Sequence, residues 1–201
     1  MLHHLISGVT RSGKTTLARA MANIFARKKN PPIILVFDPM GTQTAGDDWP
    51  ENAFVFDDAD KFLNYCENIA RHERITRTYD AAKGKNYLLF IDEADNIFSL
   101  SQKENNWLLT RGRHYGFTCI LICQRPNMVA PNSRKNCAVV CAFRLARSDS
   151  KLLGDETGHN DIDKINLDTG DYLVLVSGSS VYTRHNIFNQ LRKGMRTWKH
   201  T

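Results

Sequence analysis

The sequence contains no apolar run that approaches the ~20 residues of a membrane span, and its N-terminus lacks the charged and apolar regions of a signal peptide. It also contains no internal repeat and no low-complexity segment. We therefore expect a soluble intracellular protein with no direct membrane insertion.

Cysteine is also scarce, with five residues in the chain. Four of them form two pairs at a C-x-x-x-C spacing, Cys119 with Cys123 and Cys137 with Cys141, which resembles the spacing of metal ligands. Both pairs lie in apolar, strand-like runs, where residues four apart share a face. We therefore expect buried, reduced thiols and predict no zinc site.

Length and composition favour one α/β domain over residues 1–201. Hydrophobic residues make up 42% of the chain and charged residues 24%, which is ordinary for a globular domain with a sizeable core. The formal net charge of +6 favours polyanionic partners such as nucleic acid, although an ordinary solvated basic surface explains the same excess.

The most informative segment is Gly8-Val9-Thr10-Arg11-Ser12-Gly13-Lys14-Thr15, a complete G-x-x-x-x-G-K-[ST] motif directly behind the apolar run Leu5-Ile6. A loop of this kind, between a strand and a helix, directs backbone N–H groups and a helix N-terminus at a phosphate chain. Lys14 then reaches the outer phosphates, and Thr15 reaches a magnesium ion. The loop and the adjoining Thr16 therefore predict a nucleoside triphosphate site.

A second motif is the apolar run at 87–91 followed by Asp92 and Glu93. It predicts a buried strand that delivers two carboxylates to its C-terminal edge, where ligands bind in an open α/β sheet. Asp92 is placed to hold magnesium through water, and Glu93 is placed to polarise an attacking water. Acids after an apolar strand can also mark only the start of a loop, but the upstream phosphate loop favours the catalytic interpretation.

The apolar runs predict a mostly parallel central sheet flanked by helices, with antiparallel strands near the C-terminus. Strands are expected at 2–7, 33–37, 53–56, 87–91, 117–123, 137–143 and 172–176, with a closing strand that begins at 181–183. Helices are expected from Lys14 to the stop at 28–32, and at 58–83, 103–115, 131–135 and 148–157, the last capped by Ser148.

The strand at 117–123 ends in Gln124-Arg125-Pro126, at the same edge as the acids. The Gln124 amide can detect a γ-phosphate or orient water, although a glutamine at a strand end is satisfied by backbone just as often. The helix before this strand carries Arg111 and Arg113, either of which can be an ordinary solvated arginine.

Two segments are locally basic, residues 71–77 in the long helix and the tail at about 190–201. A solvated helix face explains the first segment. The more specific alternative is that it binds nucleic acid or a neighbouring subunit. The tail is expected to be loosely ordered or to face DNA.

Three segments together resemble the FtsK–HerA superfamily of DNA-pumping ATPases. They are the loop at 8–15, the strand and acids at 87–93, and residues 111–126, where an Arg-containing, Gly-ended helix leads into an apolar strand that closes with Gln-Arg-Pro. The likeness extends from residue 5 to about residue 145. It implies a P-loop NTPase fold of the additional-strand, catalytic-glutamate type.

Carried over by position, the resemblance implies roles for five residues. Lys14 and Thr15 contact nucleotide and magnesium, Asp92 contacts magnesium, Glu93 is the catalytic base and Gln124 is the phosphate sensor. ATP and Mg²⁺ are therefore the implied cofactors.

The resemblance also implies an arginine finger donated across a subunit interface, for which Arg111 and Arg113 are the candidates. A finger supplied in trans stabilises the γ-phosphate charge. A closed ring is the simplest arrangement in which every subunit donates one, so we expect a homo-oligomeric ring, a hexamer or a pentamer.

A chain with almost nothing outside the motor core is most similar to the genome-packaging ATPases of tailless icosahedral viruses with an internal membrane. We expect neither an N-terminal membrane anchor nor a C-terminal DNA-reading domain, which chromosome-segregating relatives carry. The resemblance therefore implies an ATP-driven motor that packages viral double-stranded DNA into a preformed capsid. The implied locations are the host cytoplasm and the packaging vertex of the virion, with portal or membrane proteins as further partners.

Other functions remain open. Another DNA pump of the superfamily is one, and a filamentous-phage-type secretion or assembly ATPase is a near relative, disfavoured by the missing membrane segment. A small nucleoside or nucleotide kinase also has about 200 residues and an N-terminal phosphate loop, but gives no purpose to the acids, the arginines or Gln124. A non-enzymatic assembly subunit that holds ATP as structural glue has no use for Glu93.

Overall fold

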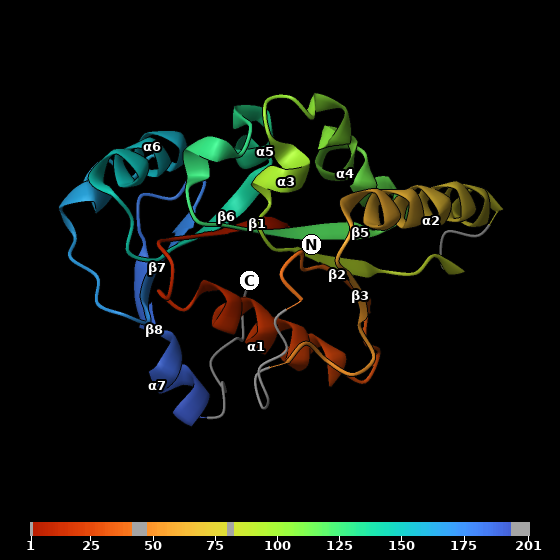
Figure 1. Cartoon of the computed structure of the whole chain (residues 1–201), viewed down its shortest axis with the longest axis horizontal. Coiled ribbons are helices and arrows are strands. Elements are labelled where there is room, and N and C mark those ends of the chain that lie inside the picture. The colour runs from red at the N-terminus through yellow and green to blue at the C-terminus, as the bar shows by residue number, and fades with distance from the viewer. Residues whose placement is uncertain (1, 42–47, 80–82, 194–201) are drawn as a thin grey trace.

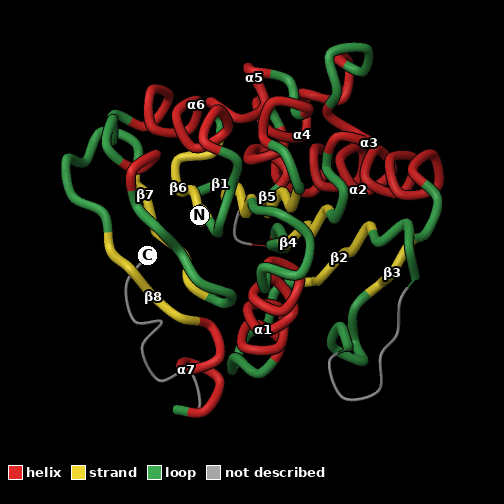
Figure 2. The backbone as a smooth tube through the Cα atoms, turned by 60° about the vertical axis from the view of Figure 1, so that its left-hand side comes forward, coloured by secondary structure: helices red, strands yellow, loops and turns green. Residues whose placement is uncertain are grey.

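In the computed structural model, which describes residues 2–41, 48–79 and 83–193, eight strands form one sheet in the order β3-β2-β4-β5-β1-β6-β7-β8 (Figures 1 and 2). The strands β1 to β6 run parallel, whereas β7 is antiparallel to both β6 and β8. Their bounds are β1 His3–Ser7, β2 Ile33–Phe37, β3 Phe54–Phe56, β4 Tyr87–Ile91, β5 Phe117–Cys123, β6 Cys137–Ala142, β7 Asp171–Val176 and β8 Thr183–Asn186. The predicted α/β class and the mixed sheet are confirmed.

Helices cover both faces of the sheet, as Figure 1 shows. One face carries α1 (Lys14–Ala26) and α7 (Ile187–Arg192), and the other carries α2 (Ala59–Tyr79), α3 (Asp95–Phe98), α4 (Trp107–Thr110), α5 (Pro131–Lys135) and α6 (Arg147–Thr157). Each layer has its own apolar core, which explains why the central strands are apolar on both sides.

The strand order decides where the functional groups meet. The chain enters the sheet at β1, builds β2 to β5 on one side of it, and then crosses over to add β6 on the other side. The C-terminal ends of β1, β4 and β5 therefore lie at one edge, next to the point where the strand order reverses, which is where open α/β sheets bind ligands.

The expected helix at 103–115 is not continuous. It is a 3₁₀ turn at Lys103–Asn106, the short α4, and a second 3₁₀ turn at Gly112–Tyr115 that ends at Gly116 with a φ of +82°. The prediction of one helix was wrong because the segment has no continuous stripe of apolar residues beyond Leu108 and Leu109, which are its buried aliphatic contacts.

Other boundaries also differ from the prediction. The residue before α6 is Ala146 and no side chain caps the helix, so Ser148 is not its cap. The closing strand begins at Thr183, two residues later than expected, and it leads into α7, which the sequence did not predict. Two further 3₁₀ turns, Pro126–Met128 and Ile162–Lys164, were not predicted. Most of the basic tail at 190–201 lies outside the described residues.

All five cysteines are free and buried, as predicted. The two pairs differ, however, because Cys119 and Cys123 belong to the same core cluster, whereas Cys137 and Cys141 belong to opposite ones. The pairing of β1 with β6 shifts between His3 and His4, which turns the second pair onto different faces and corrects the expectation that both pairs share a face.

The longest described helix, α2, is amphipathic. Within the described part of the chain, no helix combines the length and the apolar character needed to cross a lipid bilayer.

Two neighbouring histidines make the stability of the sheet dependent on pH. Burial lowers the pKa of His4 from 6.5 to about 4, and its buried Nδ1 has no hydrogen-bond partner among the described residues. Burial also lowers the pKa of His3, whose Nδ1 accepts a bond from the Cys119 N–H at 3.0 Å. The folded state therefore holds both imidazoles neutral.

We expect the free energy of unfolding to fall as the pH is lowered from 6.5 towards 4. In this window His4 binds a proton in the unfolded chain but not in the folded chain. Its titration alone therefore lowers the free energy of unfolding by up to about 3 kcal/mol. We expect the free energy of unfolding, measured with urea at several pH values, to fall less steeply with decreasing pH in His4→Gln than in the wild type. His72→Gln, which removes an exposed histidine of α2, should keep the wild-type slope; equal slopes in all three proteins would contradict the assignment.

Candidate active site

The loop at 8–15 joins β1 to α1 and is held tightly at its start. The Gly8 N–H donates to the carbonyl of Cys123 at 3.3 Å, and the Val9 N–H donates to the carbonyl of Arg144 at 2.9 Å. At the end of the loop Gly13 has a φ of +108°, which favours glycine, and α1 begins at Lys14. The first N–H groups of α1 have no intrahelical acceptor, so they point towards a ligand.

The Lys14 side chain folds back over this loop. Its amine donates to the carbonyl of Val9 at 2.9 Å, and it is buried. Burial lowers the pKa of Lys14, and the nearby Asp92 carboxylate opposes that shift. The amine therefore already lies inside the loop, where it can exchange the carbonyl for a phosphate oxygen.

Thr15 and Asp92 come together as the sequence predicts. The Thr15 hydroxyl donates to Oδ2 of Asp92 at 3.1 Å, across 77 positions of sequence. Burial raises the pKa of Asp92, and the neighbouring Asp38 adds to the shift, while bonds from the Glu93 N–H and from Thr15 oppose it. A half-buried carboxylate beside a hydroxyl is an oxygen pair that suits Mg²⁺. The residues present fit that ion.

Glu93 follows Asp92 at the point where β4 leaves the sheet. Its φ is +46°, a left-handed conformation that is uncommon for any residue other than glycine, asparagine and aspartate. Its N–H donates to Oδ1 of Asp92 at 2.9 Å, and its Oε2 accepts a long bond of 3.5 Å from Asn96. The turn therefore fixes the backbone of Glu93 to Asp92, and the residue is half-buried where β4 leaves the sheet.

Gln124 also lies at this edge. It is the first residue after β5, and its Oε1 accepts a bond of 3.0 Å from the Thr10 hydroxyl of the loop. The structure therefore places Gln124 against the phosphate loop. Arg11, at the tip of the same loop with a φ of +61°, is exposed, and its side chain makes no hydrogen bond or ion pair among the described residues.

The two candidate arginine fingers lie at the opposite edge of the sheet. Arg111 and Arg113 precede β5, whereas Gln124 follows it, so the seven residues of β5 separate them from the loop by about 20 Å. Both are exposed and have no ion-pair partner among the described residues. Neither can reach the nucleotide site of its own chain.

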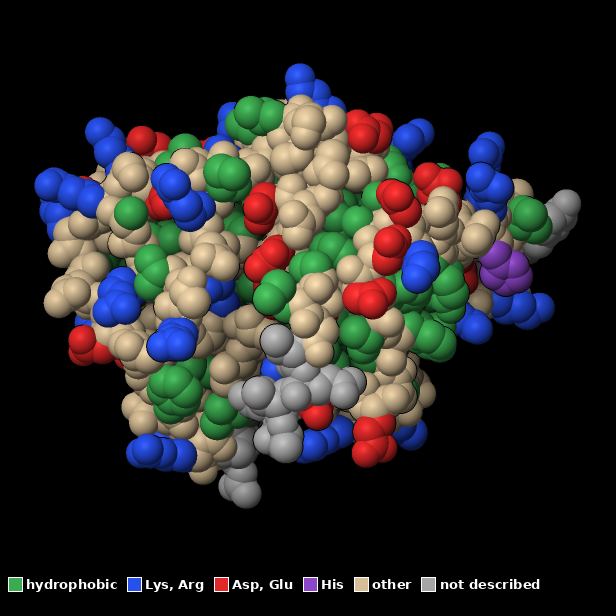
Figure 3. Space-filling view, viewed as in Figure 1, with side chains coloured by type: hydrophobic (Ala, Val, Ile, Leu, Met, Phe, Trp, Pro, Cys, Tyr) green, Lys and Arg blue, Asp and Glu red, His purple; other side chains and the backbone are tan. Residues whose placement is uncertain are grey.

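Arg111 belongs to a surface hollow of ≈ 260 Å³, which we call the arginine groove, lined by Glu67, Ala70, Arg71, Arg74, Trp107, Arg111 and Tyr115. Arg71 makes an exposed ion pair of 3.7 Å with Glu67, so the groove has a net excess of positive charge. Figure 3 shows Lys and Arg side chains at this end of the molecule, around the C-terminal half of α2, as well as at the opposite end.

The sequence did not assign a role to Asp38, which ends β2 beside Asp92. It is buried and ion-paired with Arg19 at 3.5 Å, and it accepts a bond of 3.0 Å from the indole of Trp49. The signal was the one that identified Asp92, an acid at the end of an apolar strand. The contacts of Asp38 indicate that it organises the edge rather than holding a ligand.

The chain is similar to known proteins over most of its length. A family model described as Zonular occludens toxin (Zot) matches residues 3–148. No curated protein sequence matches the chain.

Three solved structures show the extent of the likeness. The genome packaging NTPase B204 from Sulfolobus turreted icosahedral virus 2, in complex with AMPPCP, is 18% identical, with a TM-score of 0.68 over 92% of this chain and 96% of that chain. The pCW3 conjugation coupling protein TcpA with ATPgS is 16% identical, with a TM-score of 0.70 over 94% of this chain and 62% of that one. The cytoplasmic domain of the Type VII secretion ATPase EccC from Thermomonospora curvata is 13% identical, with a TM-score of 0.66 over 92% and 23%. These likenesses confirm the predicted P-loop NTPase fold.

Proposed function

The chain belongs to the Zonular occludens toxin (Zot) family and has a P-loop NTPase fold, and on this premise we propose that it hydrolyses ATP to move double-stranded DNA. The work we propose for it is the packaging of a viral genome into a preformed capsid. The observation that carries the proposal is the meeting of Thr15 with Asp92 at 3.1 Å and of Thr10 with Gln124 at 3.0 Å, with Glu93 next in the chain. The likeness to a genome packaging NTPase over 92% of the chain supports it.

The chemistry follows from these positions. The N–H groups of the loop and the Lys14 amine hold the phosphates, and Thr15 and Asp92 would hold Mg²⁺, which when bound neutralises charge on the phosphate oxygens. Glu93 takes a proton from the water that attacks the γ-phosphorus, and the Gln124 amide orients that water. The bond between the γ-phosphorus and the bridging oxygen breaks, and ADP and phosphate leave.

The position of the arginines supports a ring. Because Arg111 and Arg113 lie about 20 Å from the loop of their own chain, a finger from either must reach a neighbouring subunit. A closed ring of five or six copies of this single domain gives every site a donor. Portal or membrane proteins at the capsid vertex, and a place in the host cytoplasm or the virion, belong to the same proposal.

A different pump is the second candidate. The likeness to a Type VII secretion ATPase favours an ATPase that moves another cargo with the same site, as a secretion or assembly ATPase does. The site chemistry is then unchanged, and only the response to DNA differs.

ATP hydrolysis measured with and without double-stranded DNA, together with the native mass, tests the proposal. We expect DNA to raise the rate and the mass to be that of a ring. The DNA concentration that gives half-stimulation should rise steeply with salt, because every phosphate contact releases counterions. A DNA-independent ATPase would favour the secretion pump, and phosphate transfer to a nucleoside would indicate a kinase.

Variants in the arginine groove test whether it contributes to the salt dependence of DNA stimulation. If the groove contacts DNA phosphates, Arg71→Ala with Arg74→Ala should lower the log–log salt slope by roughly 2. The matched control is Lys28→Ala with Lys29→Ala, which removes two exposed cations beyond the end of α1. An equal change in both double variants would mean that the groove has no special part in DNA binding.

A further inference from the structure

Arg144 lies beside the start of the phosphate loop, on the side away from the acids. It follows β6, which pairs with β1 in parallel so that Ala142 is opposite Ser7. Beyond the strand, the Phe143 N–H donates to the Ser7 carbonyl at 2.8 Å, and the Arg144 carbonyl accepts from the Val9 N–H at 2.9 Å. The backbone of Arg144 is therefore fixed to the loop.

The loop and the segment after β6 pack closely at this point. A Cβ at Gly8 would lie 2.5 Å from the Cβ of Phe143 and 3.2 Å from the Arg144 carbonyl oxygen, so only glycine fits. The close approach fixes the root of the Arg144 side chain relative to the loop before any ligand binds.

Arg144 and Gln124 bracket the loop from its two neighbouring strands. The Gly8 N–H bonds to the end of β5 and the Val9 N–H to the segment after β6. Gln124 contacts the loop through Thr10. Arg144 occupies the corresponding place on the other flank, which no sequence motif marks.

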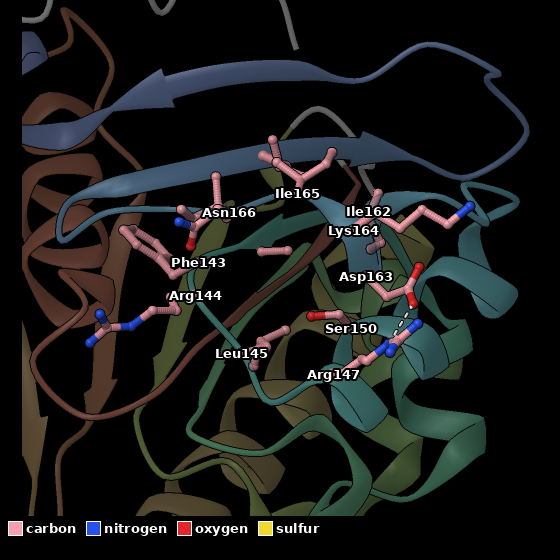
Figure 4. A pocket seen from close by; sticks show the side chains of 13 residues that line it. Phe143, Arg144, Leu145, Arg147, Ser150, Ile162, Asp163, Lys164, Ile165 and Asn166 are labelled. Carbon is pink, nitrogen blue, oxygen red and sulfur yellow. Dashed lines mark hydrogen bonds and ion pairs between the residues drawn. The ribbon is translucent and has the colours of Figure 1, made fainter.

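Among the described residues, no acidic side chain pairs with Arg144. Other arginines near this edge have acidic partners: Arg125 with Asp149 at 3.5 Å, Arg134 with Glu156 at 2.6 Å and Arg147 with Asp163 at 3.1 Å. Arg144 is exposed and has no such partner in the part of the chain that the structure describes. It lines a hollow of ≈ 330 Å³, but Figure 4 shows its side chain pointing away from that hollow, towards the loop between β1 and α1.

We propose that Arg144 binds the phosphate chain of the nucleotide held by the loop at 8–15. The proposal rests on the proposed function of that loop. A guanidinium offers planar paired donors that match phosphate oxygens, whereas the Lys14 amine is a point charge. The Lys14 amine donates to the Val9 carbonyl, and the Arg144 backbone carbonyl accepts from the Val9 N–H, so both residues are anchored at the same part of the loop.

The test measures the affinity of the full-length chain for ATP, ADP and GTP by calorimetry. Arg144→Ala should weaken the binding of all three by about 10- to 100-fold, since it removes charge-assisted hydrogen bonds to phosphate, and Arg144→Lys should restore part of the loss. The ratio of ATP to GTP affinity should not change, because the two share their phosphates. The melting temperature without nucleotide should stay at the wild-type value.

Arg147→Ala is the matched control, because Arg147 lines the same hollow but is paired with Asp163. It should bind nucleotides as the wild type does. Wild-type affinity in Arg144→Ala would overturn the proposal, and so would a changed ATP to GTP ratio, which would place the guanidinium on the base. If the wild type and the control bind no nucleotide either, the proposed function fails together with this inference.

Discussion

Alanine at one of two positions, Arg111 or Arg113, should lower kcat for ATP hydrolysis by about 10³- to 10⁵-fold, whereas alanine at the other should have little effect. The reason is that a guanidinium at the γ-phosphate stabilises charge that develops only in the transition state. Both side chains are exposed at the edge opposite the loop, so the affected site is that of a neighbouring subunit. Steady-state ATPase assays of the two single variants identify the finger.

A subunit-mixing experiment distinguishes an arginine finger from an arginine that only supports folding. The inactive arginine variant is combined with Lys14→Ala, whose own loop is disabled but whose arginines are intact. Activity should reappear, because some interfaces then pair a wild-type arginine with a wild-type loop. Two arginine variants that both keep the wild-type rate, or a loss that mixing does not rescue, would contradict donation in trans.

Glu93→Gln should lower the rate of hydrolysis by about 10²- to 10⁴-fold and leave ATP affinity near that of the wild type. Glutamine keeps the shape of the side chain and its place beside Asn96 but cannot take a proton from water. Thr15 and Asp92, which would hold the metal, are unchanged. Single-turnover hydrolysis and equilibrium ATP binding, measured on the same protein, give the two quantities.

The control for this variant is Glu67→Gln, which makes the same chemical change at an exposed acid of α2. It should hydrolyse ATP at the wild-type rate. Survival of hydrolysis in Glu93→Gln would remove Glu93 from the base assignment, and a large loss of ATP affinity would indicate that the carboxylate supports binding instead.

The positions of the loop at 8–15 and of the acids were predictable because each is marked by a short sequence motif, and the sheet topology brings the two motifs together. A parallel sheet brings the C-terminal ends of its strands to one edge, so Asp92 meets Thr15 although 77 positions separate them. The same rule placed Gln124 beside the loop. Sequence alone was sufficient to place these residue types at the ends of buried strands; the roles proposed for them stay predictions.

The features that were not predicted depend on which strands pair in the sheet, and no local sequence pattern indicates that pairing. Arg144 also follows a buried strand, but its closeness to the loop depends on β6 pairing with β1, which no local pattern indicates. The β-bulge that separates Cys137 from Cys141 has the same origin, a register set by the partner strand.

The left-handed turn at Glu93 has a consequence for how this position responds to selection. A non-glycine residue with a φ of +46° costs roughly 1–2 kcal/mol, which glycine would recover. If Glu93 is the base proposed above, a population selected only for resistance to heat would tend to replace the glutamate and lose ATP turnover. Thermal stability and turnover would then exert opposite selective pressures on this one residue.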